Sequence, residues 1–232
     1  MKTQFFFWLL ACALTPVVFG ASSTQGESGK AKVATVMPES QVENFSNWDD
    51  SSFSTFFYDT TVNFSQYDQA IFFPMTFDRM ELAQTTNDEY LESWSKSSFN
   101  EMDKICQFFD DFLMKKFKSS RYITPTLKGG PNVLAIEFRM KDFMPMSMRR
   151  EDALGTVGSS TNAMGVGILT FQAVLVESQT GRLVAVIEDG MNISSGTNSV
   201  DDRIGRNMAW RRSFRDIVAK LHQDFKMLEE KG

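Results

Sequence analysis

Apolar side chains near the C-terminus recur at intervals of three and four residues. They are Trp210, Phe214, Ile217, Val218, Leu221, Phe225 and Leu228. This spacing places them on one side of a helix and leaves polar residues on the other side. The segment that follows residues 198–205 is therefore predicted to be an amphipathic helix. Such a helix must pack against other elements to be stable in water.

A second helix is predicted from residue 98 onward. Ser98 and Glu101 have the spacing of a capping box, in which each side chain satisfies a backbone N–H of the first turn. Apolar residues then repeat at three and four positions, and lysines near the end complement the negative pole of the helix. The apolar residues are Met102, Ile105, Cys106, Phe109, Phe112, Leu113 and Phe117, and the lysines are Lys115, Lys116 and Lys118.

Between the two helices the period changes to two, which is typical of strands with one buried face. In residues 132–141, the apolar Leu134, Ile136, Phe138 and Met140 alternate with the charged Glu137, Arg139 and Lys141. Residues 166–177 and 182–191 are predicted to form a hairpin, with Gly181 in the left-handed position of its turn. Another strand is predicted at 67–77, where Pro74 requires an edge position or a bend.

The order of these elements mixes strands and helices without strict alternation. With a further short strand at 121–126, it runs strand, helix, short strand, paired strands, helix. The sequence therefore predicts an α+β fold, with a single largely antiparallel sheet and two main helices packed on one face. The 232 residues suffice for one medium-sized domain, which we assign to residues 65–232.

Residues 41–64 are rich in aromatic side chains. They include Phe45, Phe53, Phe56, Phe57 and Phe64, together with Trp48 and Tyr58. A flexible segment is not expected to hold so many rings. We therefore predict that this segment packs on the domain, for example as an extra strand. The alternative is an exposed apolar surface for a partner or a membrane.

The first twenty residues have the features of a secretory signal peptide. Lys2 precedes an apolar run, and Val18 and Gly20 satisfy the small-residue rule for cleavage after residue 20. Residues 21–40 are polar and aperiodic, which predicts a flexible tether. A lipobox-like segment that ends at Cys12 offers the alternative of an acylated lipoprotein, and an uncleaved anchor is a further alternative. The protein is predicted to be exported, to the periplasm or in association with the outer membrane.

Charge and composition exclude several classes of function. The chain has 24 basic and 29 acidic residues, a net charge of −5, which argues against nucleic-acid binding. A single histidine, His222, excludes most histidine-based metal sites, and two cysteines exclude a disulfide-rich scaffold. Cys106 lies on the apolar stripe of the first helix, which predicts a buried, unreactive thiol. We predict no cofactor.

Three stretches together resemble one protein family. Phe64–Ala70 leads into an apolar strand, Val176–Ala185 forms a hairpin, and Ser213–Asp216 lies in the C-terminal helix. Their order is similar to that of the bacterial envelope lipoproteins grouped as domain of unknown function 3313. The resemblance covers roughly residues 55–230, and it implies an envelope location and a lipid anchor but no reaction. The early position of Cys12 departs from the usual lipoprotein signal.

A cluster of methionines is one candidate site. Met144, Met146 and Met148 have the alternate spacing of thioethers that bind Cu(I), and Met140 precedes them. The simpler interpretation is that Met140 continues the apolar face of its strand and the others fill space in a loop. Neither Cys nor His lies nearby in the sequence to complete a copper site.

Arginines supply the second candidate, an interaction surface. Arg206, Arg211 and Arg212 lie in the C-terminal helix, and Arg149 and Arg150 lie in a loop. This basic concentration in an acidic chain suits anionic headgroups, glycans or a partner protein. The alternative is the ordinary polar face of a helix, because acidic residues are interspersed.

These patterns favour a non-enzymatic binding or scaffolding role in the bacterial envelope. The predicted partner is an envelope protein or an anionic surface, and the oligomeric state stays open. Two alternatives remain, a periplasmic enzyme with a carboxylate-based site and a weak copper-binding protein that uses the methionine loop.

The signal peptide makes a prediction about the mature chain. Cleavage after Gly20 should leave Ala21 as the first residue of the exported protein. Intact-mass analysis of protein purified from the envelope measures this directly. An acylated chain that begins at Cys12 would contradict the prediction and would support a lipid anchor.

Overall fold

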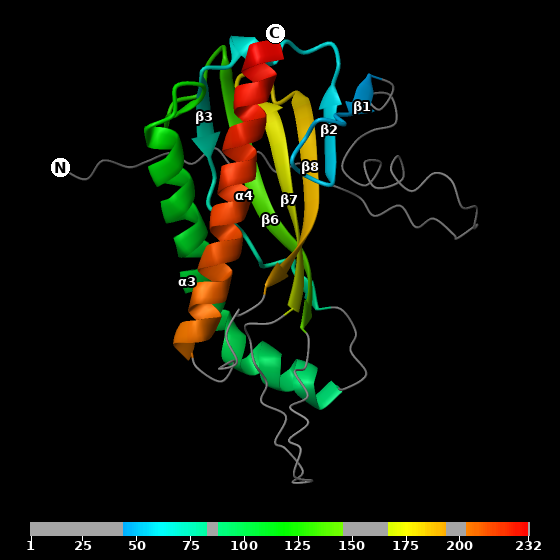
Figure 1. The fold of residues 1–232 in the computed structure, drawn as a ribbon, viewed down its shortest axis with the longest axis vertical. Coiled ribbons are helices and arrows are strands. Elements are labelled where there is room, and N and C mark those ends of the chain that lie inside the picture. The colour runs from blue at the N-terminus through cyan, green and yellow to red at the C-terminus, as the bar shows by residue number, and fades with distance from the viewer. Residues whose placement is uncertain (1–43, 83–87, 146–166, 194–202, 232) are drawn as a thin grey trace, which may run out of the picture.

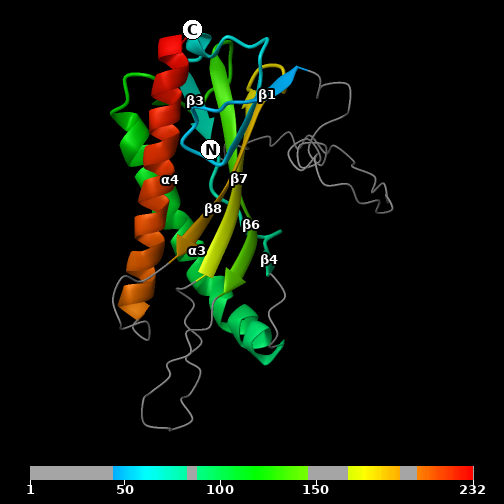
Figure 2. The ribbon, with the colours of Figure 1, turned by 45° about the vertical axis from the view of Figure 1, so that its right-hand side comes forward.

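The computed structural model describes residues 44–82, 88–145, 167–193 and 203–231. Two long helices, α3 (Asp88–Lys118) and α4 (Arg203–Lys231), lie side by side against one sheet (Figure 1). The turned view in Figure 2 shows both helices on the same side of the central strands. The α+β class predicted from the sequence is confirmed.

The described residues contribute eight strands to the sheet. The first four are β1 (Phe45–Asn47), β2 (Thr55–Asp59), β3 (Gln69–Phe72) and β4 (Glu81–Leu82). The others are β5 (Thr124–Pro125), β6 (Val133–Pro145), β7 (Gly167–Glu177) and β8 (Leu183–Ile193). Their spatial order is β1-β2-β8-β7-β6-β3-β5, with β4 also beside β6, and a short 3-10 helix, η1 (Phe64–Gln66), precedes β3.

The sheet is mixed, and this corrects the prediction of a largely antiparallel sheet. The neighbours from β1 through β2, β8 and β7 to β6 are antiparallel, whereas β3 and β4 run parallel to β6, and β5 runs parallel to β3. The chain leaves β3, returns through α3 to the end where β3 began, and enters β6 in the same direction. Such a crossover is what a parallel pair requires.

Helix α3 begins at Asp88, ten residues before the predicted start at Ser98. Acidic residues at Asp88, Glu89 and Glu92 stand near the positive pole of the helix, where carboxylates are stabilising. Leu and Glu in this stretch also have good helix propensity. The capping-box pattern therefore lies inside the helix and does not mark its beginning.

The predicted strand 67–77 is interrupted, because regular pairing stops at Phe72, two residues before Pro74. The chain nevertheless continues along β6, since the Thr76 N–H donates to the carbonyl of Phe138 at 3.0 Å. On the helix side, the carboxylate of Asp110 in α3 accepts the N–H of Met75 at 3.0 Å. This path, together with β4, forms a bent edge beside β6.

The core lies between the helices and the sheet and is strongly aromatic. Phe109 of α3 contacts Phe138 of β6 and Phe214 of α4, with ring centroids 4.9 and 5.4 Å apart. Trp210 stands 5.5 Å from Phe143 of β6. All five side chains are essentially completely buried. Helix α4 is thus docked through the stripe that its sequence period predicts.

Residues 44–59 extend the sheet and join it to α4. The ring centroids of Phe53 and Phe171 of β7 lie 5.8 Å apart, and β2 pairs with β8. The fully buried carboxylate of Asp224 in α4 accepts the Ser51 hydroxyl at 2.5 Å and the Ser52 N–H at 3.0 Å. Aromatic packing and one buried carboxylate therefore hold this edge of the sheet.

Replacement of Phe214 by Ala should destabilise the protein strongly. The buried ring contacts Phe109 and Trp210, so its removal should lower the free energy of unfolding by about 3–5 kcal/mol, the usual range for a core aromatic residue. Arg212→Ala, an exposed change two residues away, should cost less than about 1 kcal/mol. Denaturant melts of both variants provide the comparison, and equal midpoints for wild type and Phe214→Ala would contradict it.

Candidate functional site

A groove of about 530 Å³ lies on the face of the sheet opposite the helices. Alternation along β6 explains its position, because Ile136 and Phe138 point into the core while Glu137 and Arg139 point to the other face. One wall is the bent edge that follows Pro74. The lining residues are Thr76, Asp78, Arg79, Glu81, Glu137, Arg139, Met140, Lys141, Asp142 and Gln172.

A row of polar residues crosses the sheet at this groove. Arg139, Gln172 and Glu188 are register partners on β6, β7 and β8. Arg139 donates from Nε and Nη2 to the two carboxylate oxygens of Glu137 at 2.8 and 2.7 Å. These hydrogen bonds raise the pKa of the Arg139 guanidinium. Lys141 Nζ donates to Glu188 Oε2 at 2.9 Å, so cations and carboxylates alternate over the face.

A β-bulge in β6 adds a charged side chain to the surface of the groove. The register between β6 and β7 shifts between Met140 and Asp142, which leaves Lys141 as the extra residue. Met140 and Phe143 remain buried, while Lys141 and Asp142 both line the groove. The bulge thus places two consecutive charged side chains at the same surface, which regular alternation would not allow.

The groove presents charges of both signs. Its carboxylates are Asp78, Glu81, Glu137 and Asp142, and its cations are Arg79, Arg139 and Lys141. Glu81 and Asp142 are register partners on neighbouring parallel strands. Within the described residues, no group of three or more His, Cys, Asp or Glu side chains is arranged to hold a metal ion. The arrangement suits a ligand that carries both donors and acceptors.

The predicted copper-binding residues are placed only in part. Met144 lies near the end of β6 with 40% of its surface exposed, whereas Met146 and Met148 lie outside the described residues. The structure therefore does not test the predicted thioether site.

The predicted arginine surface is likewise only partly described. Arg212 is exposed on α4, whereas Arg211 is half-buried. Arg206 is in the same helix, and its side chain is not described. Arg149 and Arg150 also lie outside the described residues. Arg211 stacks on Phe108 of α3, with Cζ 3.9 Å from the ring centroid.

Cys106 and His222 lie apart from the groove. Cys106 is buried, as predicted, and burial raises the pKa of its thiol to about 12, which disfavours the reactive thiolate. His222 packs between Phe117 and Tyr122, with ring centroids at 5.4 and 5.8 Å, and burial lowers the pKa of its imidazole. Both residues belong to the helix packing.

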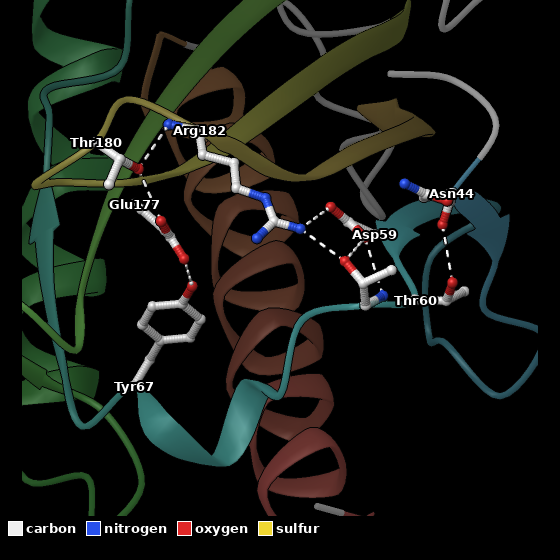
Figure 3. Close-up of polar contacts among 8 residues, drawn as sticks. Asn44, Asp59, Thr60, Tyr67, Glu177, Thr180 and Arg182 are labelled. Atoms are coloured by element: carbon white, nitrogen blue, oxygen red, sulfur yellow. Dashed lines mark hydrogen bonds and ion pairs between the residues drawn. The ribbon is translucent and has the colours of Figure 1, made fainter. Parts of the chain in front are cut away.

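A second polar cluster closes the end of the sheet at the β7–β8 turn (Figure 3). Tyr67 donates its hydroxyl proton to Glu177 at 2.7 Å, and the Thr180 hydroxyl donates to the same carboxylate at 2.7 Å. The hydrogen bonds from Thr180 and Tyr67 hold the pKa of Glu177 below its usual range. Gly181 adopts a positive φ of 71°, as its place in the turn predicts. These side chains satisfy one another's hydrogen-bonding groups, so the cluster stabilises the turn.

Arg182 joins the same turn to the first strands of the sheet, as Figure 3 shows. Its guanidinium bonds to the carboxylate of Asp59 and donates to the Thr61 hydroxyl at 2.7 Å. Burial opposes ionisation of Asp59, but hydrogen bonds from Thr61 and Arg182 outweigh it and hold the pKa of this carboxyl below its usual range.

The sequence predicts one side of the groove but not the other. The alternation through Glu137, Arg139 and Lys141 predicted the polar face of β6. The sequence gives no comparable signal for Asp78, Arg79 and Glu81, because a bent edge after a proline has no regular period. Only the pairing of the 76–82 segment with β6 brings the two sets together.

Comparison with known proteins gives no family. No family model matches the chain, and no curated protein matches it. The resemblance to domain of unknown function 3313 therefore stays a prediction. None of the described helices is long and apolar enough to cross a membrane.

Several solved structures show distant similarity. A DUF330 protein from Xanthomonas campestris has a TM-score of 0.39 and 11% identity, over 67% of this chain and 81% of that one. A proposed lipoprotein from Caulobacter crescentus has a TM-score of 0.35 and 10% identity, over 73% and 95%. A PelC dodecamer from Paraburkholderia phytofirmans has a TM-score of 0.32 and 7% identity, over 68% and 88%. Similarity at this level assigns neither a family nor a function.

The contact between Asp59 and Arg182 predicts a pH-dependent contribution to stability. Because the folded-state pKa of Asp59 is lowered, its contribution is present above the unfolded value of about 3.9 and is lost as the pH falls through the folded value. Asp59→Asn should lower the free energy of unfolding by about 1–3 kcal/mol at neutral pH. The difference from wild type should shrink below about pH 4. Denaturant melts across this range measure it, and a constant difference would contradict the assignment.

Proposed function

We propose that this chain is an exported, non-enzymatic binding or scaffolding protein of the bacterial envelope, and that the groove on the uncovered sheet face contacts its partner. The signal-like N-terminus supports the location. The observation that supports the site most directly is the array of charged side chains between the bent edge and β6, which is open to solvent on a face without described helices.

The groove chemistry favours a protein partner. Its volume of about 530 Å³ falls within the range of small-molecule pockets. Such pockets are mostly apolar, however, whereas this one is lined mainly by charged side chains. Ordered ion pairs, such as the one between Arg139 and Glu137, present donors and acceptors in defined places, and this favours specificity and fast association over raw affinity. A polypeptide segment of mixed charge matches this pattern better than a polyanion does.

The pairing of the charges also favours binding over catalysis. Glu137 is engaged in a bidentate contact with Arg139, and Lys141 is engaged with Glu188. Among the residues that line the groove there is neither a histidine nor a cysteine. A general base or nucleophile needs access to a substrate proton or carbon, and side chains engaged with each other are less suited to that task.

One observation favours the enzyme alternative. Glu81 and Asp142 are neighbouring carboxylates in the same groove, and paired carboxylates are a common acid–base arrangement. A panel of chromogenic ester, phosphate and glycoside substrates tests this candidate. Turnover that Glu81→Gln or Asp142→Asn abolishes, with the fold intact, would replace the binding proposal by an enzyme.

Site-specific photocrosslinking in the native envelope tests the binding proposal. A benzophenone side chain at position 79, on the groove wall, should give a discrete adduct with one partner. The same group at Leu127, which is 95% exposed in a loop, should give none. Arg139→Glu should abolish the adduct from position 79 because it breaks the ion pair and reverses a charge, whereas Lys128→Glu should leave it intact. Equal adducts from positions 79 and 127 would contradict the proposal.

A further inference from the structure

A second groove, of about 440 Å³, runs between α3 and α4 on the outer surface of the helix layer. Phe112 of α3 and Val218 of α4 form apolar parts of its lining. Lys115 and Lys116 come from the last turns of α3, and Arg215 comes from the middle of α4. All three cations are exposed. The residues that line this groove include no carboxylate.

Two arginine–aromatic stacks continue along the same line. Arg211 Cζ lies 3.9 Å from the ring centroid of Phe108, and Arg215 Cζ lies 4.9 Å from that of Phe112. The rings are one helical turn apart on α3, and the arginines are one turn apart on α4. A guanidinium that stacks on a ring keeps its in-plane donors available for phosphate oxygens. Arg211 Nε is buried and has no hydrogen-bond acceptor among the described residues, so the exposed Arg215 is the arginine that lines the groove.

An exposed apolar side chain extends this surface. Met208 lies two turns before Arg215 on the same side of α4, and 51% of its surface is exposed. The acidic residues Asp111 and Asp216 are exposed on the same helices but do not line the groove. The net charge of the chain is −5, so attraction to an anion requires a local group of cations such as this one.

Cations around an apolar lining, with an exposed methionine beside them, complement an anionic amphiphile. Lysine and arginine stems pack on apolar surface while their charged ends reach headgroups. Among anionic partners, the surface of a phospholipid bilayer offers phosphates and acyl chains together. We propose that the groove between α3 and α4 binds the phosphates of anionic phospholipids and holds the helix layer against a membrane surface.

Reversal of a single charge in this groove should have a measurable effect on vesicle binding. A basic residue near an anionic bilayer contributes about 1 kcal/mol, which corresponds to roughly a fivefold change in affinity. Reversal of one charge should therefore weaken vesicle binding by at least about fivefold. Added salt should weaken binding of the wild-type protein further, because exposed charges are screened within about 8–10 Å at physiological ionic strength.

Vesicle flotation tests the proposal with the mature chain beginning at Ala21, so that no acyl group on Cys12 contributes. The wild-type protein should bind phosphatidylglycerol-containing vesicles and not pure phosphatidylcholine vesicles. Lys115→Glu and Arg215→Glu should each lose at least about fivefold in affinity. Lys115→Arg should keep it, and the matched control Lys128→Glu, in a loop outside the groove, should leave it unchanged.

Stability controls separate binding from folding. Lys115 also complements the negative pole of α3, so Lys115→Glu is expected to lower the melting temperature to some extent. Arg215 lies in the middle of its helix, and its reversal should reduce vesicle binding with the fold retained. Equal binding to both kinds of vesicle, or an equal loss in Lys128→Glu, would overturn the proposal. Stabilisation by inorganic phosphate without vesicle binding would identify an isolated anion site and would also overturn it.

Discussion

The aromatic contacts between the helices and one face of the sheet determine where the other surfaces of this protein lie. Phe109 joins the two helices to the sheet through Phe214 and Phe138, and it is fully buried. Because α3 and α4 both cover the same face, every strand residue that points away from them belongs to a face without described helices. The charged groove is thus the reverse side of the aromatic core, and β6 contributes to both through its period of two.

Carboxylates at the boundary between the helices and the sheet secure the less regular parts of the fold. Asp110 of α3 accepts an N–H from the bent edge after Pro74, and Asp224 of α4 accepts the backbone and hydroxyl of the loop before β2. Asp189 of β8 is bonded to Lys220 of α4 at 2.7 Å. Each contact gives a buried polar group a partner, and the first two let irregular backbone pack against a helix. The wall of the charged groove depends on the first of these contacts.

The two proposed surfaces lie on opposite sides of the domain. The mixed-charge groove belongs to the sheet, and the basic groove belongs to the outside of the helix layer. A domain with two such surfaces would suit the proposed scaffolding role, because a membrane contact on one side leaves the other side free for a partner. The chemistry differs accordingly, since paired charges suit a specific polypeptide and exposed cations beside an apolar lining suit lipid phosphates.

The sequence by itself determined the elements whose period is regular. Helix α4, the strands β6 to β8 and the buried Cys106 follow from repeats of three, four and two, because burial of one face imposes those repeats. It did not determine the beginning of α3, since residues 88–97 are mainly polar, and helix propensity and the positive pole favour the helix there. The mixed sheet and both grooves were decided by the tertiary structure alone. Residues such as Asp78 and Arg139, or Phe112 and Arg215, are distant in the chain, and only the crossover through α3 and the docking of α4 bring them together.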